Sequence, residues 1–230
     1  MIPIRDDVPT RVAPVVVVSL IAANAVTFLY EISLAAGEGA DAGRVAEFIN
    51  RWGLIPREFL RGAVEPNATE QMVWLTPITA MFIHGGLLHL AGNLLYLWIF
   101  GNSIEDLLGH GRFLVLYLAC GLAAAAVQVA SDPASYSATV GASGAISGVL
   151  GAYAVSYPTG RLRLLWPRVR VPAAGFLLLW IVLQIVSGVG AWGEEQAPVA
   201  WWAHVGGFGA GVALGRSMWV RKPTRSRLRI

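Results

Sequence analysis

The chain has 230 residues, of which 56% are apolar and 13% are charged, with a formal net charge of +3 and a mean hydropathy of +0.59. Because soluble domains carry about a quarter charged residues, this composition excludes an ordinary soluble domain and indicates a polytopic helical membrane protein. The single cysteine, Cys120, excludes an intramolecular disulfide and offers no pair of metal ligands.

The first predicted elements are a short tail at residues 1–12 and a span at Ala13–Ala36, which we expect to be retained because no small-residue cleavage site closely follows it. The first loop, Gly37–Thr76, is too long for a plain connector, and its mixture of large apolar side chains, arginines and glutamates predicts short amphipathic helices at the membrane interface. Five further spans are predicted at Pro77–Phe100, Phe113–Ala130, Val140–Tyr157, Val171–Val189 and Val199–Trp219. The prediction is one all-α transmembrane domain over residues 1–230, a six-helix bundle with a basic tail at 220–230.

The basic residues predict the orientation of the bundle. All lysines and arginines except Arg44, Arg51, Arg57 and Arg61 fall in the two tails and in the loops on one side. By the positive-inside rule, both termini are predicted to be cytoplasmic, in the cytoplasmic (inner) membrane. We interpret these arginines as determinants of topology, so the expected partner is the lipid bilayer and no nucleic acid.

Polar residues within the spans are the candidates for function, because polar groups are costly in a bilayer. Ser143 and His204 lie a few residues inside the outer ends of the fourth and sixth spans. His89 and Asn93 share a face of the second span at i, i+4. His84 is about 140° from His89 on an ideal helix, so it joins them only if Gly85–Gly86 bends the chain.

Small residues predict that the fourth and sixth spans pack closely. His204, Gly207 and Gly211 share one helix face, and Ser143, Ser147 and Gly151 share a face of the fourth span, where Gly144 is a further small packing residue. His204 could then remove the proton of Ser143, and His89 and Asn93 could stabilise an oxyanion. Gly207→Leu is therefore predicted to inactivate the protein, and Gly207→Ala to act more mildly.

Several other interpretations compete at this level. A serine or glycine in a membrane helix is most often a packing residue, and a lone histidine can be a hydrogen-bonding strut. Histidines across a bundle could also hold haem or a metal, although no acidic or cysteine partner lies near them in the sequence; no metal or other cofactor is expected. Composition and spacing alone leave an enzyme and a transporter equally plausible, but the inverted repeat and broken helices of many transporters are not evident.

Four stretches taken together resemble the rhomboid family of intramembrane serine proteases. They are "GLIPREF" from Gly53, "HGGLLHLAGN" from His84, "GASGAISG" from Gly141 and "AHVGGFGAG" from Ala203. Their order and their positions on the second, fourth and sixth spans agree with the six-span bacterial form of that family.

The resemblance implies that Ser143 is the nucleophile and His204 its general base, in a dyad without an acid. It implies that His89 and Asn93 bind the oxyanion with His84 nearby, and that Gly207 and Gly211 hold the sixth span against the fourth. The expected substrates are single-span membrane proteins cut near the outer face of the membrane. The alternative within the family is an inactive rhomboid-like factor for membrane-protein binding or quality control.

Two positions depart from the family pattern. The stretch before the second span contains Trp74 without the arginine that many relatives place beside it, and Ser147 stands where some relatives have an aromatic residue that packs on the histidine. These departures concern the anchoring of the first loop and the orientation of His204, and neither alters the dyad.

Overall fold

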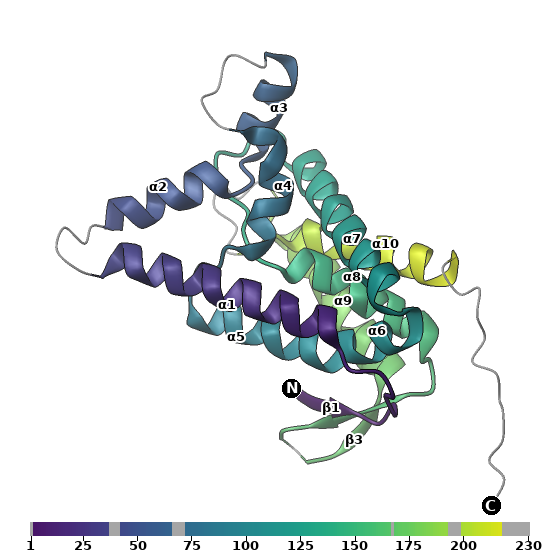
Figure 1. Cartoon of the computed structure of the whole chain (residues 1–230). Helices are drawn as coiled ribbons and strands as arrows, with labels where there is room; N and C mark the ends of the chain where they lie inside the picture. Colours follow the sequence, from purple (N-terminus) through teal and green to yellow (C-terminus); the bar gives the residue numbers. More distant parts are fainter. Residues whose placement is uncertain (1, 37–41, 66–71, 167, 193–198, 218–230) are drawn as a thin grey trace, which may run out of the picture.

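The computed structural model describes residues 2–36, 42–65, 72–166, 168–192 and 199–217, and it is mostly helical (Figure 1). The predicted basic tail at 220–230 and Glu194–Glu195 lie outside the described residues. Among the described residues, four helices are long and apolar enough to cross a membrane: Val15–Ala35, Leu87–Leu108, His110–Ser131 and Ala173–Gly190. This pattern is that of a polytopic helical bundle.

Helix α1 (Val15–Ala35) confirms the first predicted span, and the first loop forms the two expected helices, α2 (Ala42–Trp52) and α3 (Pro56–Val64). Both helices have one apolar and one charged face, and Figure 1 shows α2 lying beside α1 and α3 projecting from the bundle. Pro56 begins α3 at a position where its missing N–H costs no hydrogen bond.

The second predicted span, Pro77–Phe100, is wrong in its boundaries. Three short pieces, η1 (Val73–Leu75), α4 (Thr76–Thr79) and η2 (Ala80–Phe82), end at an extended residue, and the chain turns at Gly86, where φ is +158°. The long helix starts only at α5 (Leu87–Tyr96) and continues through η3 (Leu97–Gly101) and α6 (Asn102–Leu108). His84 therefore precedes the helix that carries His89.

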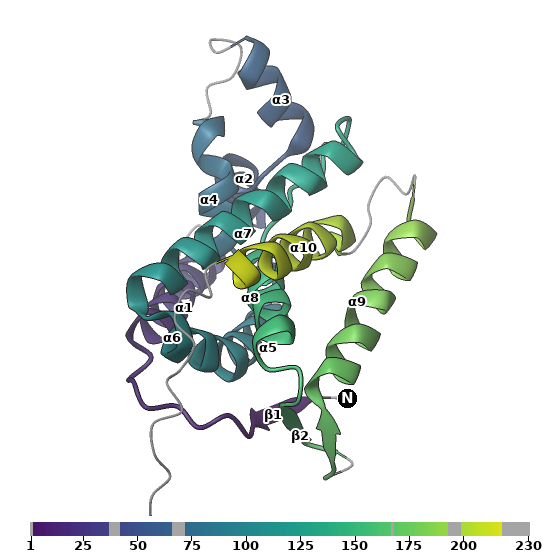
Figure 2. The same cartoon turned by 90° about the vertical axis from the view of Figure 1, so that its right-hand side faces the viewer.

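The remaining helices are α7 (His110–Ser131), α8 (Ser143–Ser156), α9 (Ala173–Gly190) and α10 (Trp201–Ser217). They fall on the third to sixth predicted spans, but α8 has 14 residues and α10 has 17. Helix α8 is the centre of the bundle: every side chain from Gly144 to Tyr153 is buried. Figure 2 shows α8 behind α10, with α7 on one side and α9 at the edge of the molecule.

The all-α prediction missed a small antiparallel sheet in the order β1 (Pro3–Asp6), β2 (Arg161–Leu164), β3 (Arg170–Pro172). The first strand comes from the tail at residues 1–12, and the other two come from the loop between α8 and α9 (Figure 1). The side chains of Leu162 and Leu164 are fully buried, so one face of the sheet closes the end of the hydrophobic core.

Two adjacent carboxylates of α6 fix the start of α1. Glu105, itself fully buried, accepts the backbone N–H groups of Val16 and Val17, and Asp106 accepts those of Arg11 and Val12. Carboxylates at a helix N-terminus satisfy unpaired amides and interact favourably with the helix dipole. The acidic pair therefore ties the first span to the end of the second.

Candidate active site

Ser143 is the first residue of α8, where the chain turns sharply into the helix. Gly141 has φ +117°, which only glycine adopts readily, and its N–H donates to the carbonyl oxygen of Ala80. The loop before it is held by the paired backbones of Leu54 and Thr139. At a helix start the first amides have no carbonyl partner within the helix, so the N–H groups at the start of α8 are suited to bind an incoming anion.

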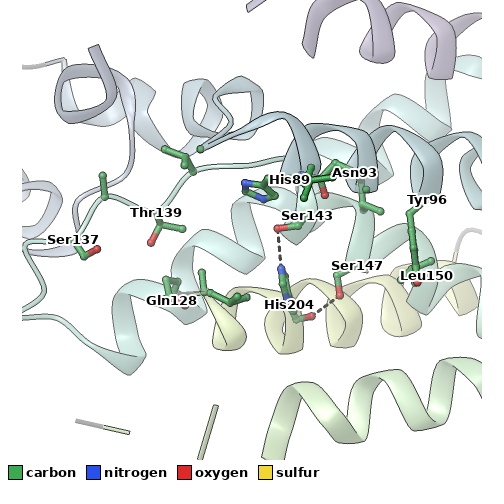
Figure 3. Close-up of a pocket in the computed structure, with 18 of the residues that line it drawn as sticks. His89, Asn93, Tyr96, Gln128, Ser137, Thr139, Ser143, Ser147, Leu150 and His204 are labelled. Carbon is green, nitrogen blue, oxygen red and sulfur yellow. Dashed lines mark hydrogen bonds between the residues drawn. The ribbon is translucent and has the colours of Figure 1, made fainter. Parts of the chain in front are cut away.

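His204 lies directly opposite this serine. Its Nε2 is 2.8 Å from Ser143 Oγ, and its side chain is 9% exposed (Figure 3). The backbone of α10 is held at the same level, because Ser147 Oγ donates a 2.6 Å hydrogen bond to the carbonyl oxygen of His204. Ser147 therefore links α8 to α10 by a hydrogen bond, at the position where an aromatic side chain was expected to pack on the histidine ring.

The approach of α8 and α10 depends on glycine. A Cβ built at Gly207 would overlap the carbonyl oxygen of Gly144, and one at Gly211 would overlap that of Gly148. A Cβ at Gly151 would overlap the backbone of Phe208 in the same way. The two backbones therefore touch along a seam that any side chain would open.

The second ring nitrogen of His204 has a partner that the sequence analysis missed. Gln184 of α9, 8% exposed, places Oε1 at 2.7 Å from His204 Nδ1. An amide oxygen can only accept, so Nδ1 carries the proton and Nε2 presents its lone pair to the Ser143 hydroxyl. Trp180, one turn earlier on α9, packs its ring 5.8 Å from the imidazole, in a tilted arrangement.

His89 and Asn93 face the serine from α5 (Figure 3). Both converge on Gly141: a Cβ there would lie 2.7 Å from His89 Cε1 and 3.6 Å from Asn93 Nδ2. Asn93 is 7% exposed, and within the described residues its Nδ2 has no hydrogen-bond partner. A buried amide donor without a partner is costly unless a ligand satisfies it.

The break before α5 brings His84 to the same region, as the sequence analysis required. The rings of His84 and His89 are 5.2 Å apart. The backbone N–H of His84 donates to Glu31 of α1, a carboxylate that is 4% exposed, at 3.1 Å. Within the described residues, His84 Nε2 also has no partner.

His89, Asn93, Ser143 and His204 line one pocket of about 710 Å³. Other residues that line it are Trp180 from α9, Gln128 from α7, and Ser135 and residues 137–140 from the loop before α8. The described residues contain no group of three histidine, cysteine or acidic side chains placed to hold a metal ion. The pocket therefore combines a hydroxyl, a base and a set of donors.

Comparison with known proteins agrees with this geometry. The model of the rhomboid domain matches residues 71–221. This chain belongs to the rhomboid family. The match includes the segments that carry His84, His89, Asn93, Ser143 and His204.

Similar proteins include rhomboid protease GluP of Bacillus subtilis, 43% identical over 91 residues, which are 40% of this chain and 17% of that protein. The mitochondrial presenilin-associated rhomboid-like protein of Homo sapiens is 31% identical over 125 residues, 54% of this chain and 33% of that one. RHOMBOID-like protein 5 of Arabidopsis thaliana is 30% identical over 154 residues, 67% of this chain and 47% of that one. This chain therefore spans less than half the length of these relatives.

Proposed function

We propose that the chain is an intramembrane serine protease that cleaves single-span membrane proteins near the outer membrane face, with Ser143 as nucleophile and His204 as general base. The observation that carries the proposal is the 2.8 Å contact between Ser143 Oγ and His204 Nε2, made by residues 61 positions apart in the sequence. Membership of the rhomboid family supports the same reaction.

In the proposed reaction, His204 Nε2 takes the hydroxyl proton while Ser143 Oγ attacks the scissile carbonyl carbon. The resulting oxyanion accepts hydrogen bonds from Asn93 Nδ2 and from the N–H of Ser143, with His89 as a further donor. Collapse of the tetrahedral intermediate breaks the C–N bond, and the protonated imidazole donates its proton to the leaving amine. Water then attacks the acyl-enzyme, with His204 again acting as base, and releases the acid.

A dyad without an acid lacks a group that orients the imidazole, and two features of the site compensate for this. Gln184 holds the imidazole in the tautomer that can accept a proton at Nε2. The start of α8 contributes peptide N–H groups and the positive end of its dipole at the attacking oxygen. Both effects act in a site largely shielded from bulk water, where electrostatic interactions are stronger.

The test is cleavage of a single-span reporter in reconstituted membranes. Ser143→Ala and His204→Ala should each reduce the rate by about 10⁴-fold or more, while the proteins remain folded. Ser33→Ala is the matched control, because Ser33 is exposed on α1 and donates to the carbonyl oxygen of Tyr30 within its own helix; this variant should cleave normally. Cleavage by Ser143→Ala near the wild-type rate would exclude this mechanism.

The same experiment distinguishes the proposed protease from an inactive rhomboid-like factor. A factor that only binds membrane proteins would retain the reporter without cutting it, and a serine-directed fluorophosphonate probe would leave Ser143 unlabelled. A chelator should have no effect on cleavage, since the proposed chemistry uses no metal; loss of activity in EDTA would contradict it.

A further inference from the structure

A row of three arginines crosses the small sheet. In the register of the strands, Arg5 of β1 faces Arg163 of β2, and Arg163 faces Arg170 of β3. Residues directly opposite in an antiparallel pair project from the same face, so the three side chains lie side by side. Arg161, two residues before Arg163, projects from that face as well, and all four are exposed.

Like charges placed directly opposite one another destabilise a sheet. The nearby carboxylates do not neutralise this row. Asp6 points to the other face, where it accepts hydrogen bonds from Ser103 and Tyr153, and Asp7 accepts the backbone N–H of Arg161. Within the part of the chain that the structure describes, no carboxylate lies within 4.0 Å of any of these guanidinium groups.

The row lies where lipid headgroups are expected. The sheet sits at the end of the bundle where α1 and α9 begin and α8 ends (Figures 1 and 2). Leu165 and Trp166 follow β2 at the tip of its hairpin and are 51% and 81% exposed. Tryptophan concentrates at the boundary between hydrocarbon and headgroups, so this tip is suited to enter the interface beside the arginines.

We propose that Arg5, Arg163 and Arg170, with Arg161 beside them, bind the phosphate of an anionic lipid headgroup in the leaflet that the sheet faces. Guanidinium groups bind phosphate oxygens in a bidentate fork, and a row of them can share one phosphodiester. The neighbouring apolar tip favours a lipid over a nucleic acid or an acidic peptide. The proposal is independent of proteolysis and goes beyond the use of arginine as a signal of topology.

The lipid would act on the fold by joining three segments. The row takes one arginine from each strand. A phosphate shared by the three guanidinium groups would offset their mutual repulsion and so strengthen the pairing of β1 with the hairpin after α8. Strand β3 ends at Pro172 and α9 begins at Ala173 without a linker. The bound headgroup would thereby fix the base of α9, the helix that carries Gln184.

The experiment uses the full chain, purified in a neutral detergent with equal amounts of phosphatidylglycerol and phosphatidylcholine, and native mass spectrometry counts the lipids retained. The wild type should retain phosphatidylglycerol preferentially. Arg163→Gln, at the centre of the row, should reduce that preference about fivefold, since each guanidinium group that contacts the phosphate is worth about that factor. Arg112→Gln, an exposed arginine of α7 away from the sheet, is the matched control and should leave it unchanged.

Thermal unfolding supplies a second measurement, in which the difference in melting temperature between the wild type and Arg163→Gln should change with the lipid. In neutral detergent with phosphatidylcholine, Arg163→Gln should be at least as stable as the wild type, because it removes repulsion. With phosphatidylglycerol, the wild type should become the more stable protein. Equal destabilisation of Arg163→Gln in both lipids, or an unchanged lipid preference, would overturn the proposal. Equal stabilisation by inorganic phosphate alone would assign the row to a free anion and refute the lipid site.

Discussion

Helices α10 and α9 both contact the candidate base, but they pack in different ways. Helix α10 touches α8 backbone to backbone through Gly207 and Gly211, so the positions of Ser143 and His204 are fixed by main-chain contacts. Helix α9 buries a single stripe, at Ala173, Leu177, Gln184 and Gly188, and exposes the large apolar side chains between them. The candidate pair thus lies on a closely packed seam, whereas Gln184, the hydrogen-bond partner of the candidate base, lies on the helix at the edge of the bundle.

The two helices would therefore respond differently if the proposed site opened for a substrate. Displacing α10 would break backbone packing and separate Ser143 from His204. Displacing α9 would break the contacts of Gln184 and Trp180 with His204 but leave the Ser143–His204 hydrogen bond in place. We expect substitutions along the seam to abolish reaction and substitutions on α9 to reduce it.

The largest effect is expected at the seam. Gly207→Leu should lower the rate of probe labelling at Ser143 by at least about 10²-fold, because the side chain must force α10 away from the carbonyl oxygen of Gly144. The sequence predicts a mild effect for Gly207→Ala, but the structure predicts a severe one, since the Cβ alone overlaps that oxygen. Gly209→Ala, on the same helix with nothing within 4 Å of its Cβ, is the control. Normal labelling in Gly207→Leu would mean that the helices do not meet at this face.

The next effect concerns the oxyanion donors. The His89→Ala, Asn93→Ala double variant should lower the turnover number by about 10²–10³-fold without abolishing reaction, because the N–H of Ser143 remains. The two side chains lie opposite the seam, so the expected loss is in turnover with little change in the Ser143–His204 distance. Steady-state cleavage of the reporter separates kcat from KM, and an unchanged kcat would remove both residues from the proposed role.

How far the sequence predicts this site can be judged from these residues. Hydropathy and charge locate the spans, and small residues at helical spacing predict the seam, because these are properties of single helices in lipid. The positions of Ser143 and His204, a few residues inside the outer ends of their spans, follow from the same span boundaries. The break at Gly86 is not predicted in advance, since the apolar run continues through it and only the backbone shows where the helix starts.

Gln184 and the sheet were missed for different reasons. Gln184 is a polar residue inside an apolar run, which is itself a signal, but a search restricted to ionisable groups passes over an amide. The strands have only four, four and three residues, and β1 pairs with β2 across 156 to 161 positions of sequence, so no local pattern distinguishes them from loop. Their register, and with it the arginine row, is a product of tertiary packing.

A smaller effect is expected on α9. Gln184→Leu should lower kcat by up to about tenfold with little change in KM, because the imidazole loses the acceptor that fixes its tautomer. Gln184→Glu keeps an acceptor oxygen at the same reach and should recover most of the rate, which a purely structural role would not predict. Leu183→Ala, an exposed neighbour, is the control. If Gln184→Leu and Leu183→Ala have equal rates, the hydrogen bond does not orient the base.

The smallest effect is expected where the sheet meets the bundle, and it bears on stability alone. The Asp6 carboxylate accepts hydrogen bonds from Ser103 Oγ at 2.6 Å and from the Tyr153 hydroxyl at 3.1 Å. Desolvation on burial raises the pKa of Asp6 above its usual value of 3.8, and these two hydrogen bonds only partly oppose the shift. The folded state therefore binds this proton more tightly than the unfolded state does.

The sign of the pH dependence follows from that preference. The stability that the protonated Asp6 contributes is present below pH 3.8 and is lost as the pH rises through the raised pKa of the folded state. Asp6→Asn keeps an acceptor oxygen but has no proton to lose. The melting temperature of Asp6→Asn relative to the wild type should therefore increase between about pH 4 and about pH 7. Cleavage at neutral pH should stay close to that of the wild type, because the seam between α8 and α10 is untouched.

A stability difference that is constant with pH, or that changes in the opposite direction, would show that burial does not control the ionisation of Asp6. The sheet would then be held to the bundle by its strand pairing and by the buried Leu162 and Leu164, without a contribution from this carboxylate.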